Sequence, residues 1–310
     1  WHVEEPISDS AIITTYLVSE LAARSVKVIL SGVGGDELFA GYQRYLGDHY
    51  GRQYRRIPAW LRRGIGSLAG RLPSGRHSRM MDLARYARQF LRASELPWRE
   101  QYRMFVQICA RESVKDLLRY APAAQDGFDG IVQKDHGEDS LLRLMRVDAE
   151  TQLAEDLLLL TDKVTMATSI ECRVPFLDHR LVEVASAVPA AVKLRGGRLK
   201  HVLKKALVGV LPDEILNRGK RGFGAPMGAW FKSELKNLRS ELLSQRTVES
   251  RGLLSWPGVQ RALAAHDSGR EDYTDLVLVL VNLEIWCRLF LDRRSSSDVA
   301  DELNELTLAA

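Results

Sequence analysis

An α/β fold is predicted by three patterns that follow one another in the first 42 residues. Residues 9–24 carry apolar side chains at helical spacing, from Ile12 to Leu21. A nearly continuous apolar run, 26–30, comes next and is typical of a buried parallel strand. The run ends at a glycine-rich turn from which a second helix is expected to begin. Helix, strand, glycine turn and helix in this order indicate a parallel sheet covered by helices.

The remainder of the chain is predicted to be mostly helical. Helical patterns cover 140–160, 181–188 and 197–210, and the last of them ends at the Leu211-Pro212 junction. A loop rich in glycine and proline, 219–228, interrupts the pattern, which then continues to Leu291. The polar tail from Arg293 is expected to be frayed.

The composition is that of a folded protein with a mildly basic surface. The 310 residues include 44 Lys and Arg against 40 Asp and Glu, a net charge of +4, and 45% are hydrophobic. This balance excludes a disordered tail and is far from the strong positive charge of a typical nucleic-acid binder. Cys109, Cys172 and Cys287 lack metal-ligand spacing and are expected to be reduced core thiols. Reduced thiols of this kind predict a cytoplasmic protein. No apolar run is long enough to cross a bilayer.

The basic excess is concentrated in residues 51–103. This segment contains 13 Arg but only three acidic residues, Asp82, Glu95 and Glu100. One interpretation is a solvated face of surface helices, and the other is a contact surface for tRNA or another polyanion. We favour the solvated face and keep an RNA-binding module as the alternative from a different functional class.

The segment 31–42, with the sequence SGVGGDELFAGY, is the most informative for function. Ligands of open α/β sheets bind at the carboxyl ends of strands, where glycines let backbone N–H groups approach an anion. Asp36 follows three glycines near the predicted helix start, so its carboxylate is well placed for Mg²⁺ that bridges phosphate oxygens. The alternative, of equal weight, is a tight turn in which Asp36 is only the helix N-cap.

Two further segments place charged side chains in apolar or flexible surroundings. Glu171 and Arg173 flank Cys172 in an apolar run, so each is expected to need a partner, either in a structural salt bridge or on substrate. Lys220 and Arg221 precede a glycine-containing loop. A loop that closes a cation onto a phosphate is one interpretation, and a flexible basic surface loop is the simpler one.

Together these segments, in this order and spacing, closely resemble the synthetase domain of glutamine-dependent asparagine synthetases. The resemblance runs from about His2 to about Phe290 and includes the segments 31–42, 171–178, 199–205 and 212–231. It implies a Rossmann-like ATP-pyrophosphatase fold, related to the adenine-nucleotide hydrolases, that is helix-rich and incomplete at its N-terminal end. Within the partial domain 1–310, the ATP and acceptor site would come from 1–50 and 146–235, a helical insertion from 51–145, and C-terminal helices from 236–292.

The resemblance also implies a reaction and a set of site residues. In that family ATP adenylates the β-carboxylate of aspartate, pyrophosphate leaves, and ammonia released from glutamine in another domain displaces AMP. The roles carried over by matching position are nucleotide contact for Ser31 and Gly32, Mg²⁺ and pyrophosphate binding for Asp36, phosphate contact for Lys163, the acceptor site for Glu171 with Arg173 in its shell, and stabilisation of the adenylation transition state for Lys220.

Three departures from the family pattern are present. The pyrophosphate loop Ser-Gly-Gly-x-Asp-Ser and the glutaminase domain are absent from these 310 residues, which begin at Trp1. We therefore expect a fragment of a longer protein that is inactive by itself. Val33 stands where many asparagine synthetases carry an acidic residue. This position leaves open a related amidotransferase or cyclase that acts on a sugar acid, a peptide or a β-amino acid.

The expected partners are those of this reaction. They are ATP, a carboxylic-acid acceptor for which aspartate is the leading candidate, and ammonia from a glutaminase domain of the same full-length chain. A homodimer is a possible assembly. Neither a membrane nor a nucleic acid is an expected partner.

Overall fold

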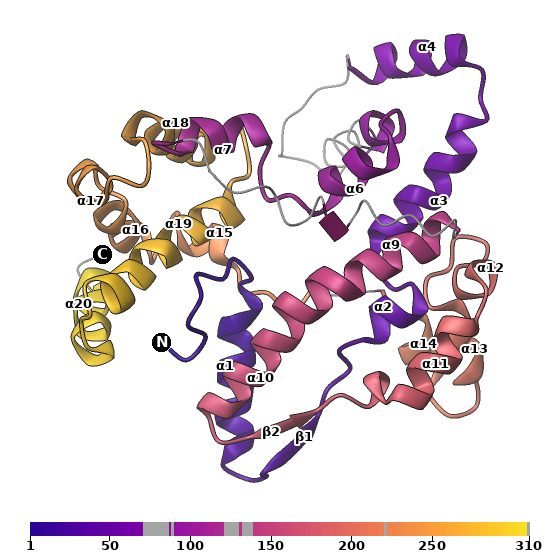
Figure 1. The fold of residues 1–310 in the computed structure, drawn as a ribbon, viewed down its shortest axis with the longest axis horizontal. Coiled ribbons are helices and arrows are strands. Elements are labelled where there is room, and N and C mark those ends of the chain that lie inside the picture. Colours follow the sequence, from indigo (N-terminus) through magenta and orange to yellow (C-terminus); the bar gives the residue numbers. More distant parts are fainter. Residues whose placement is uncertain (71–86, 88–89, 121–129, 132–138, 220–221, 309–310) are drawn as a thin grey trace.

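The computed structural model describes residues 1–70, 87, 90–120, 130–131, 139–219 and 222–308, which form a helix-rich α/β structure (Figure 1). The elements up to the second strand are α1 (Ala11–Ala23), β1 (Val28–Leu30), α2 (Gly35–Phe39), α3 (Gln43–Arg55), α4 (Ala59–Gly70), α6 (Trp98–Val106), α7 (Arg111–Leu117), α9 (Ser140–Asp148), the π-helix η1 (Ala149–Leu158), α10 (Leu159–Ala167) and β2 (Glu171–Arg173). The elements after it are the 3₁₀ helix η2 (Pro175–Leu177), α11 (His179–Ala187), α12 (Ala190–Lys193), α13 (His201–Ala206), α14 (Asp213–Asn217), α15 (Met227–Trp230), α16 (Lys236–Leu242), α17 (Gln245–Arg251), α18 (Trp256–Asp267), α19 (Thr274–Trp286), the π-helix η3 (Cys287–Leu291) and α20 (Ser296–Leu308).

The predicted parallel strand is confirmed as β1, which pairs with β2 so that Val28 lies opposite Glu171 and Leu30 opposite Arg173. The prediction that this strand is buried is wrong, because the side chains of Val28 and Leu30 are 43% and 71% exposed. The physical reason is the size of the sheet. Within the described residues it has two strands, and no third element covers the face that carries these side chains.

The first helix is also confirmed, as α1. Asp9 begins it, since its carboxylate accepts a hydrogen bond from the Ala11 N–H at 2.8 Å. The helix predicted over 140–160 begins at Ser140 as expected but continues to Ala167, because α9, η1 and α10 form one long helix (Figure 1). Its last part packs along α1, where Leu160 and Val164 are buried, and it leads directly to β2.

A buried carboxylate anchors the long helix to the elements that come after the glycine turn. Asp148, which is 0% exposed, accepts hydrogen bonds from the hydroxyls of Tyr45 on α3 and Tyr102 on α6, and it forms an ion pair with Arg44 at 2.8 Å. Burial and the Asp148 charge raise the pKa of both tyrosines, so they remain protonated donors. The apolar cluster around this group includes Leu141, Leu144 and Val147 of α9.

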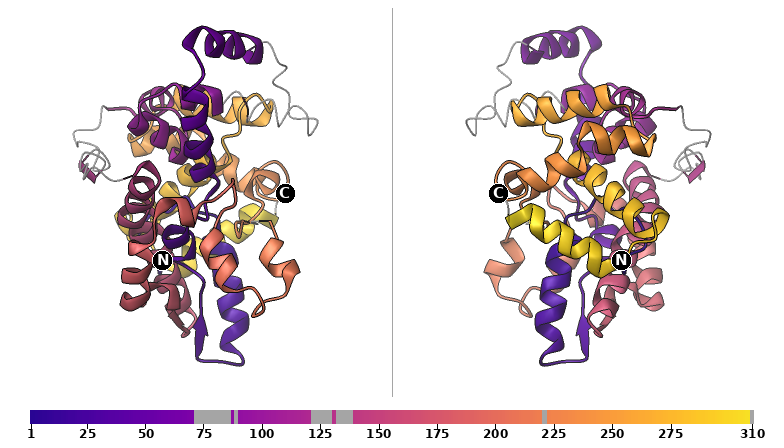
Figure 2. Two further views of the ribbon diagram at one scale, coloured as in Figure 1. Left: turned by 90° about the vertical axis from the view of Figure 1, so that its right-hand side faces the viewer. Right: turned by 90° about the vertical axis from the view of Figure 1, so that its left-hand side faces the viewer.

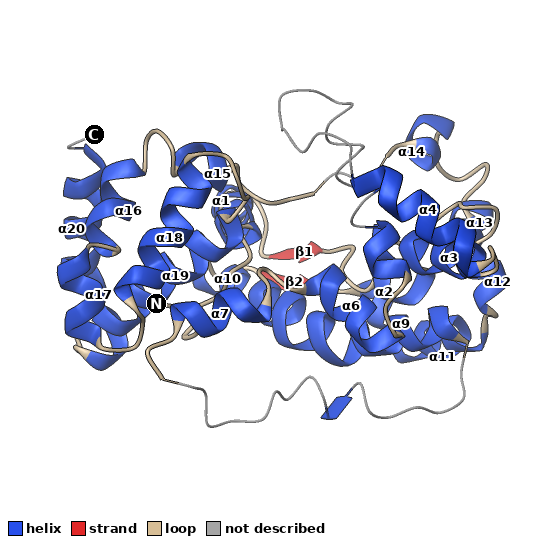
Figure 3. Ribbon diagram, turned by 90° about the horizontal axis from the view of Figure 1, so that it is seen from above, coloured by secondary structure: helices blue, strands red, loops and turns tan. Residues whose placement is uncertain are grey.

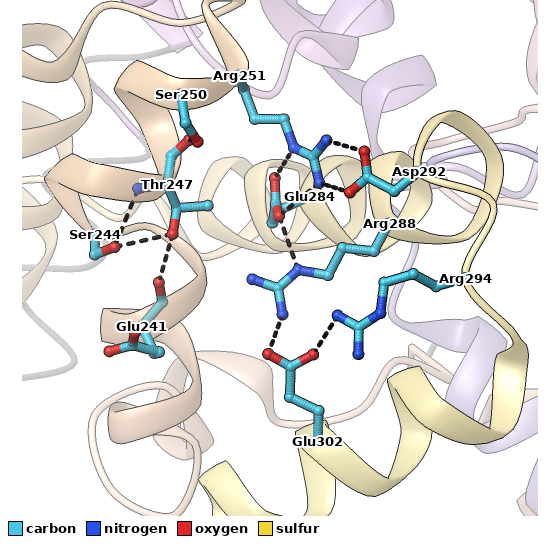
Figure 4. A network of polar contacts seen from close by, with 10 residues as sticks. All are labelled: Glu241, Ser244, Thr247, Ser250, Arg251, Glu284, Arg288, Asp292, Arg294 and Glu302. Carbon is cyan, nitrogen blue, oxygen red and sulfur yellow. Dashed lines mark hydrogen bonds and ion pairs between the residues drawn. The ribbon is translucent and has the colours of Figure 1, made fainter.

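The helices from α15 to α20 form a separate apolar cluster, which lies on the side of the strands opposite α11 to α14 (Figure 3). Here the prediction of a frayed tail is wrong, because α20 is a helix that packs against α16 and buries Val299. The polar residues of the tail are held by charge. Glu302 of α20 accepts hydrogen bonds from Arg288 and Arg294, each at 2.6 Å (Figure 4).

The Arg-rich segment 51–103 lies partly outside the described residues. Helix α4 stands away from the rest of the molecule in both views of Figure 2. Two arginines of the segment form ion pairs within the chain. Arg52 of α3 contacts Asp139 at 3.3 Å, and Arg62 of α4 contacts Glu95 at 2.5 Å. These pairs support the interpretation as a solvated helical face.

The other sequence-based expectations can be checked directly. All three cysteines are free thiols, but only Cys287 is buried, while Cys109 and Cys172 are half-buried. Over the part of the chain that the structure describes, every helix is too short or too polar to span a lipid bilayer.

Candidate active site

The glycine turn connects the end of β1 to the start of α2. The Ser31 N–H donates a hydrogen bond to the Arg173 carbonyl at 2.8 Å, which extends the parallel pairing by one step beyond β1. Gly34 then takes φ +90°, and a side chain there would also collide with Leu177. Gly34 is the N-cap of α2, so the interpretation of Asp36 as the N-cap is wrong. Asp36 instead lies in the first turn, on the side of the helix that faces a cleft.

This cleft has a volume of about 1080 Å³ and lies between α2, the start of α3, α13 and the loop after α14. Its described lining holds more positive than negative side chains: the cations are Arg198, Lys200, Lys204, Lys205 and Arg218, and the carboxylates are Asp36 and Asp213. A cleft of this charge attracts anions. Asp36, in the first turn of α2, is the residue that connects the cleft to the glycine turn, whose own residues lie outside the lining.

An ion pair between Asp36 and Lys200 lies in the lining of the cleft. The Lys200 Nζ is 2.9 Å from the Asp36 Oδ1, and the two side chains remain 30% and 24% exposed. The backbone of Gly41 lies so close that a Cβ there would overlap both the carboxylate and the lysine stem. The site therefore requires glycine at position 41 for steric reasons.

The chemistry of this lining fits a metal ion that arrives together with phosphate. Among the described residues no group of three His, Cys, Asp or Glu side chains is placed to hold a metal ion. Mg²⁺ is commonly bound by one or two carboxylates, with phosphate oxygens and waters completing its shell. Asp36 supplies one such carboxylate beside an anion-attracting surface.

The other residues of the turn leave its backbone accessible. The hydroxyl of Ser31 accepts a hydrogen bond from the Val33 N–H at 3.3 Å, which holds the turn closed. Gly32 is exposed and has no neighbour within 4 Å of the position that a Cβ would occupy. A ligand can therefore approach this part of the chain without meeting a side chain.

Glu171 and Arg173 are brought together on β2 by the alternation of the strand. Their side chains point to the same face, where the Arg173 Nε lies 2.7 Å from the Glu171 Oε1. The expectation that these charges lie in apolar surroundings is wrong, since the side chains are 57% and 65% exposed on the uncovered face of the sheet. The backbone bond from Ser31 to Arg173 places this pair next to the glycine turn.

Lys163 lies on α10 and forms an ion pair with Glu4 at 2.6 Å. This contact lowers the pKa of the Glu4 carboxyl and raises that of the Lys163 ammonium. Ser31, Gly32, Lys163, Glu171 and Arg173 do not line the cleft that contains Asp36. Lys220 and Arg221 lie outside the described residues.

Two features of the site were not identified from the sequence. Lys200 lies in the segment 199–205, which the resemblance includes, but a lysine alone gave no reason to pair it with Asp36. Asp156 on η1 is the other, since burial and, secondarily, the nearby charge of Asp9 raise its pKa to about 6. In the sequence it stands between Glu155 and a run of leucines, and it does not line the cleft that contains Asp36.

A basic cleft with a carboxylate in its lining, on an α/β fold, is suited to a phosphorylated ligand. Comparison with known proteins defines the family. The chain belongs to the asparagine synthase family, whose model matches residues 1–288. This match confirms the resemblance predicted from the sequence.

Individual relatives agree with this assignment. The chain is 29% identical to asparagine synthetase [glutamine-hydrolyzing] 1 of Bacillus subtilis (strain 168) over 297 residues, which are 95% of this chain and 45% of that protein. It is 51% identical to asparagine synthetase [glutamine-hydrolyzing] 3 of the same organism over 59 residues, 19% of this chain and 10% of the relative. Amidase chry2 of Gibberella zeae is 25% identical over 295 residues, 85% of this chain and 42% of the amidase. The chain thus spans about half the length of the curated relatives that it matches most fully.

Proposed function

We propose that the chain forms the larger, C-terminal part of a synthetase domain that makes amides at the expense of ATP. The carboxylate of an acceptor attacks the α-phosphate of ATP, so that an acyl-adenylate forms and pyrophosphate leaves. Ammonia then attacks the acyl carbon, AMP leaves, and the ammonium proton passes to solvent. The observation that carries this proposal is the basic cleft around Asp36, because the triphosphate of ATP and the pyrophosphate that leaves carry most of the negative charge in the reaction.

The chain's own residues have distinct roles in this proposal. The backbone at Ser31 and Gly32 contacts the nucleotide, and the cations of α13 receive the pyrophosphate. Asp36 holds Mg²⁺, which supplies neutralisation of the phosphate charge when it is bound. Lys163 contacts the phosphates, Lys220 acts on the adenylation transition state, and Glu171, ordered by Arg173, faces the acceptor.

Aspartate is the leading acceptor in this proposal, and asparagine the product. The names of the relatives at 29% and 51% identity support it. Val33 supports the alternative that a different carboxylic acid is amidated or cyclised, because a neutral side chain replaces the acidic one that many asparagine synthetases carry beside the first glycine.

The proposal extends to the organisation of the complete protein. A glutaminase domain in the same full-length chain would supply ammonia, and the assembly would be a cytoplasmic homodimer. The ATP-pyrophosphatase fold would be completed by chain beyond these residues, with 1–50 and 146–235 carrying the site, 51–145 as the insertion and 236–292 as the C-terminal helices.

The test is a product assay on the full-length protein with ATP, Mg²⁺ and an ammonium salt. Formation of AMP and pyrophosphate that requires aspartate is the expected result, and a panel of sugar acids and β-amino acids identifies another acceptor. Asp36→Asn is expected to abolish pyrophosphate release while glutaminase activity persists. Release of ADP and phosphate, or synthesis by Asp36→Asn within a few-fold of wild type, contradicts the proposal.

A further inference from the structure

The contact between Lys200 and Asp36 is built into the backbone on both sides. Lys200 has φ +53°, and Ala40, which precedes the contact on the other segment, has φ +56°. Both values lie in the left-handed region, which residues other than glycine, asparagine and aspartate rarely adopt. The Lys200 N–H donates to the Ala40 carbonyl at 3.2 Å, so the two strained residues hold each other in place.

Backbone strain of this kind is usually retained only where a site needs it. Here it directs the Lys200 side chain onto the Asp36 carboxylate, and Gly41 leaves the space for it. Of the cations in the described lining of the cleft, Lys200 is the one that forms an ion pair. Lys204 and Lys205 line the same cleft from the next turn of α13 without such a contact.

The position that Lys200 occupies is the one a metal ion would need. Its ammonium lies 2.9 Å from the Asp36 Oδ1, so a divalent cation bound to the same oxygen would lie beside it, and the Coulomb repulsion between the two cations opposes their binding there together. An ammonium and a metal ion therefore compete for this oxygen. Once the Lys200 ammonium is displaced from Asp36, phosphate oxygens bound in the cleft would be its nearest anionic partners.

We propose that Lys200 is a positioning residue that exchanges between two partners: the Asp36 carboxylate in the empty cleft, and phosphate oxygens once the metal ion is bound at Asp36. The proposal rests on the proposed function, in which this cleft is the phosphate site. Its consequence is that Lys200 opposes the binding of a metal ion alone and favours the binding of the metal ion together with pyrophosphate.

The test measures Mn²⁺ binding to the full-length protein by electron paramagnetic resonance, with and without inorganic pyrophosphate. Lys200→Met keeps most of the stem and removes the charge, so Mn²⁺ alone is expected to bind about five- to tenfold more tightly than to wild type. The extra affinity that pyrophosphate gives to Mn²⁺ is expected to fall by about tenfold in this variant. A purely structural role for Lys200 would not tighten the binding of any ligand.

Three control variants isolate the effect. Lys204→Met removes the same charge from the same cleft without touching Asp36, and it is expected to change the affinity for Mn²⁺ alone by about twofold or less. Asp36→Asn reports any Mn²⁺ bound elsewhere. Lys200→Gly suits φ +53° and is expected to show the same gain as Lys200→Met, which keeps the test decisive if the methionine variant unfolds.

The outcomes separate this proposal from the proposed function. If wild type binds Mn²⁺ and pyrophosphate together at Asp36, and neither Lys200 variant binds Mn²⁺ alone more tightly than Lys204→Met, the exchange is refuted and the phosphate site stands. If wild type shows no pyrophosphate-dependent Mn²⁺ binding that Asp36→Asn removes, the phosphate site is refuted, and the exchange with it.

Discussion

Replacement of Asp148 by alanine is expected to destabilise the protein more than any exposed charge deletion. The substitution removes the carboxylate that pairs with the largely buried Arg44 and accepts from the Tyr45 and Tyr102 hydroxyls, and it leaves Arg44 with its hydrogen bond to the Gln152 Oε1 at 2.6 Å. Breaking a buried ion pair by removal of one partner costs about 3–5 kcal/mol, and the substitution also removes the acceptor of two hydroxyl groups. At about 2–4 °C for each kcal/mol in a protein of this size, the melting temperature should fall by about 6–20 °C.

The assay is thermal and urea unfolding followed by circular dichroism, with two matched variants. Asp116→Ala removes a carboxylate whose partner, Arg261, is exposed, and it should cost less than about 1 kcal/mol. Tyr45→Phe removes one donor and should cost about 1 kcal/mol. A loss of unfolding free energy for Asp148→Ala as small as that for Asp116→Ala would refute the reasoning, because solvent or another partner would then compensate Arg44 after the substitution.

Three further predictions concern catalysis, pH and the C-terminal helix. Lys220→Ala in the full-length protein is expected to lower kcat by roughly 10² or more with little change in the KM for ATP, and a rise in KM alone would assign the residue to simple binding. Because burial raises the pKa of Asp156 from the ordinary 3.8 to about 6, the folded state binds its proton more tightly and the free energy of unfolding should fall as pH rises from about 4 to about 6. Urea midpoints of Asp156→Asn should lack this fall, and profiles parallel to wild type would contradict the assignment. Glu302→Ala removes the acceptor of two arginines and should lower the free energy of unfolding, measured by urea titration, by about 1–3 kcal/mol. An unchanged free energy of unfolding would mean that the contacts of α20 do not stabilise the fold.

The features predicted correctly from the sequence are those set by neighbouring residues. The start of α1 is fixed by Asp9 and its own backbone, and the glycine turn by φ values that Gly34 accepts at no steric cost. The spacing of the turn and of the segment around Glu171 also led to the family, because each motif is contiguous. Local chemistry therefore carries both the class of the protein and part of its site.

The features that were missed depend on residues distant in the chain. Lys200 and Asp36 meet only because α13 and α2 pack together, and no periodicity within either helix encodes that contact. The exposure of Leu30 depends on which elements cover the sheet. A strand has the same apolar sequence pattern whether or not another element packs on it. The tail was predicted as frayed from its polarity, whereas Glu302 is ordered by arginines that precede it on other elements.

The number of residues in the π-helix η1 determines how the elements at its two ends are oriented relative to each other. This helix lies between α9, which holds Asp148 in the core, and α10, which packs on α1 and leads to β2. Because a π-turn holds more residues than an α-turn, the angular offset between the two ends depends on the number of residues within 149–158.

Each residue added to or removed from an α-helix turns the remainder of that helix by about 100°. A single deletion within η1 would therefore rotate Leu160 and Val164 off α1 while Asp148 stayed buried at the other end. Indels that a surface loop absorbs would here shift the strand carrying Glu171 relative to the cleft carrying Asp36. The number of residues in η1 therefore sets the orientation of β2 relative to α9, and we expect it to be as constrained as its side chains.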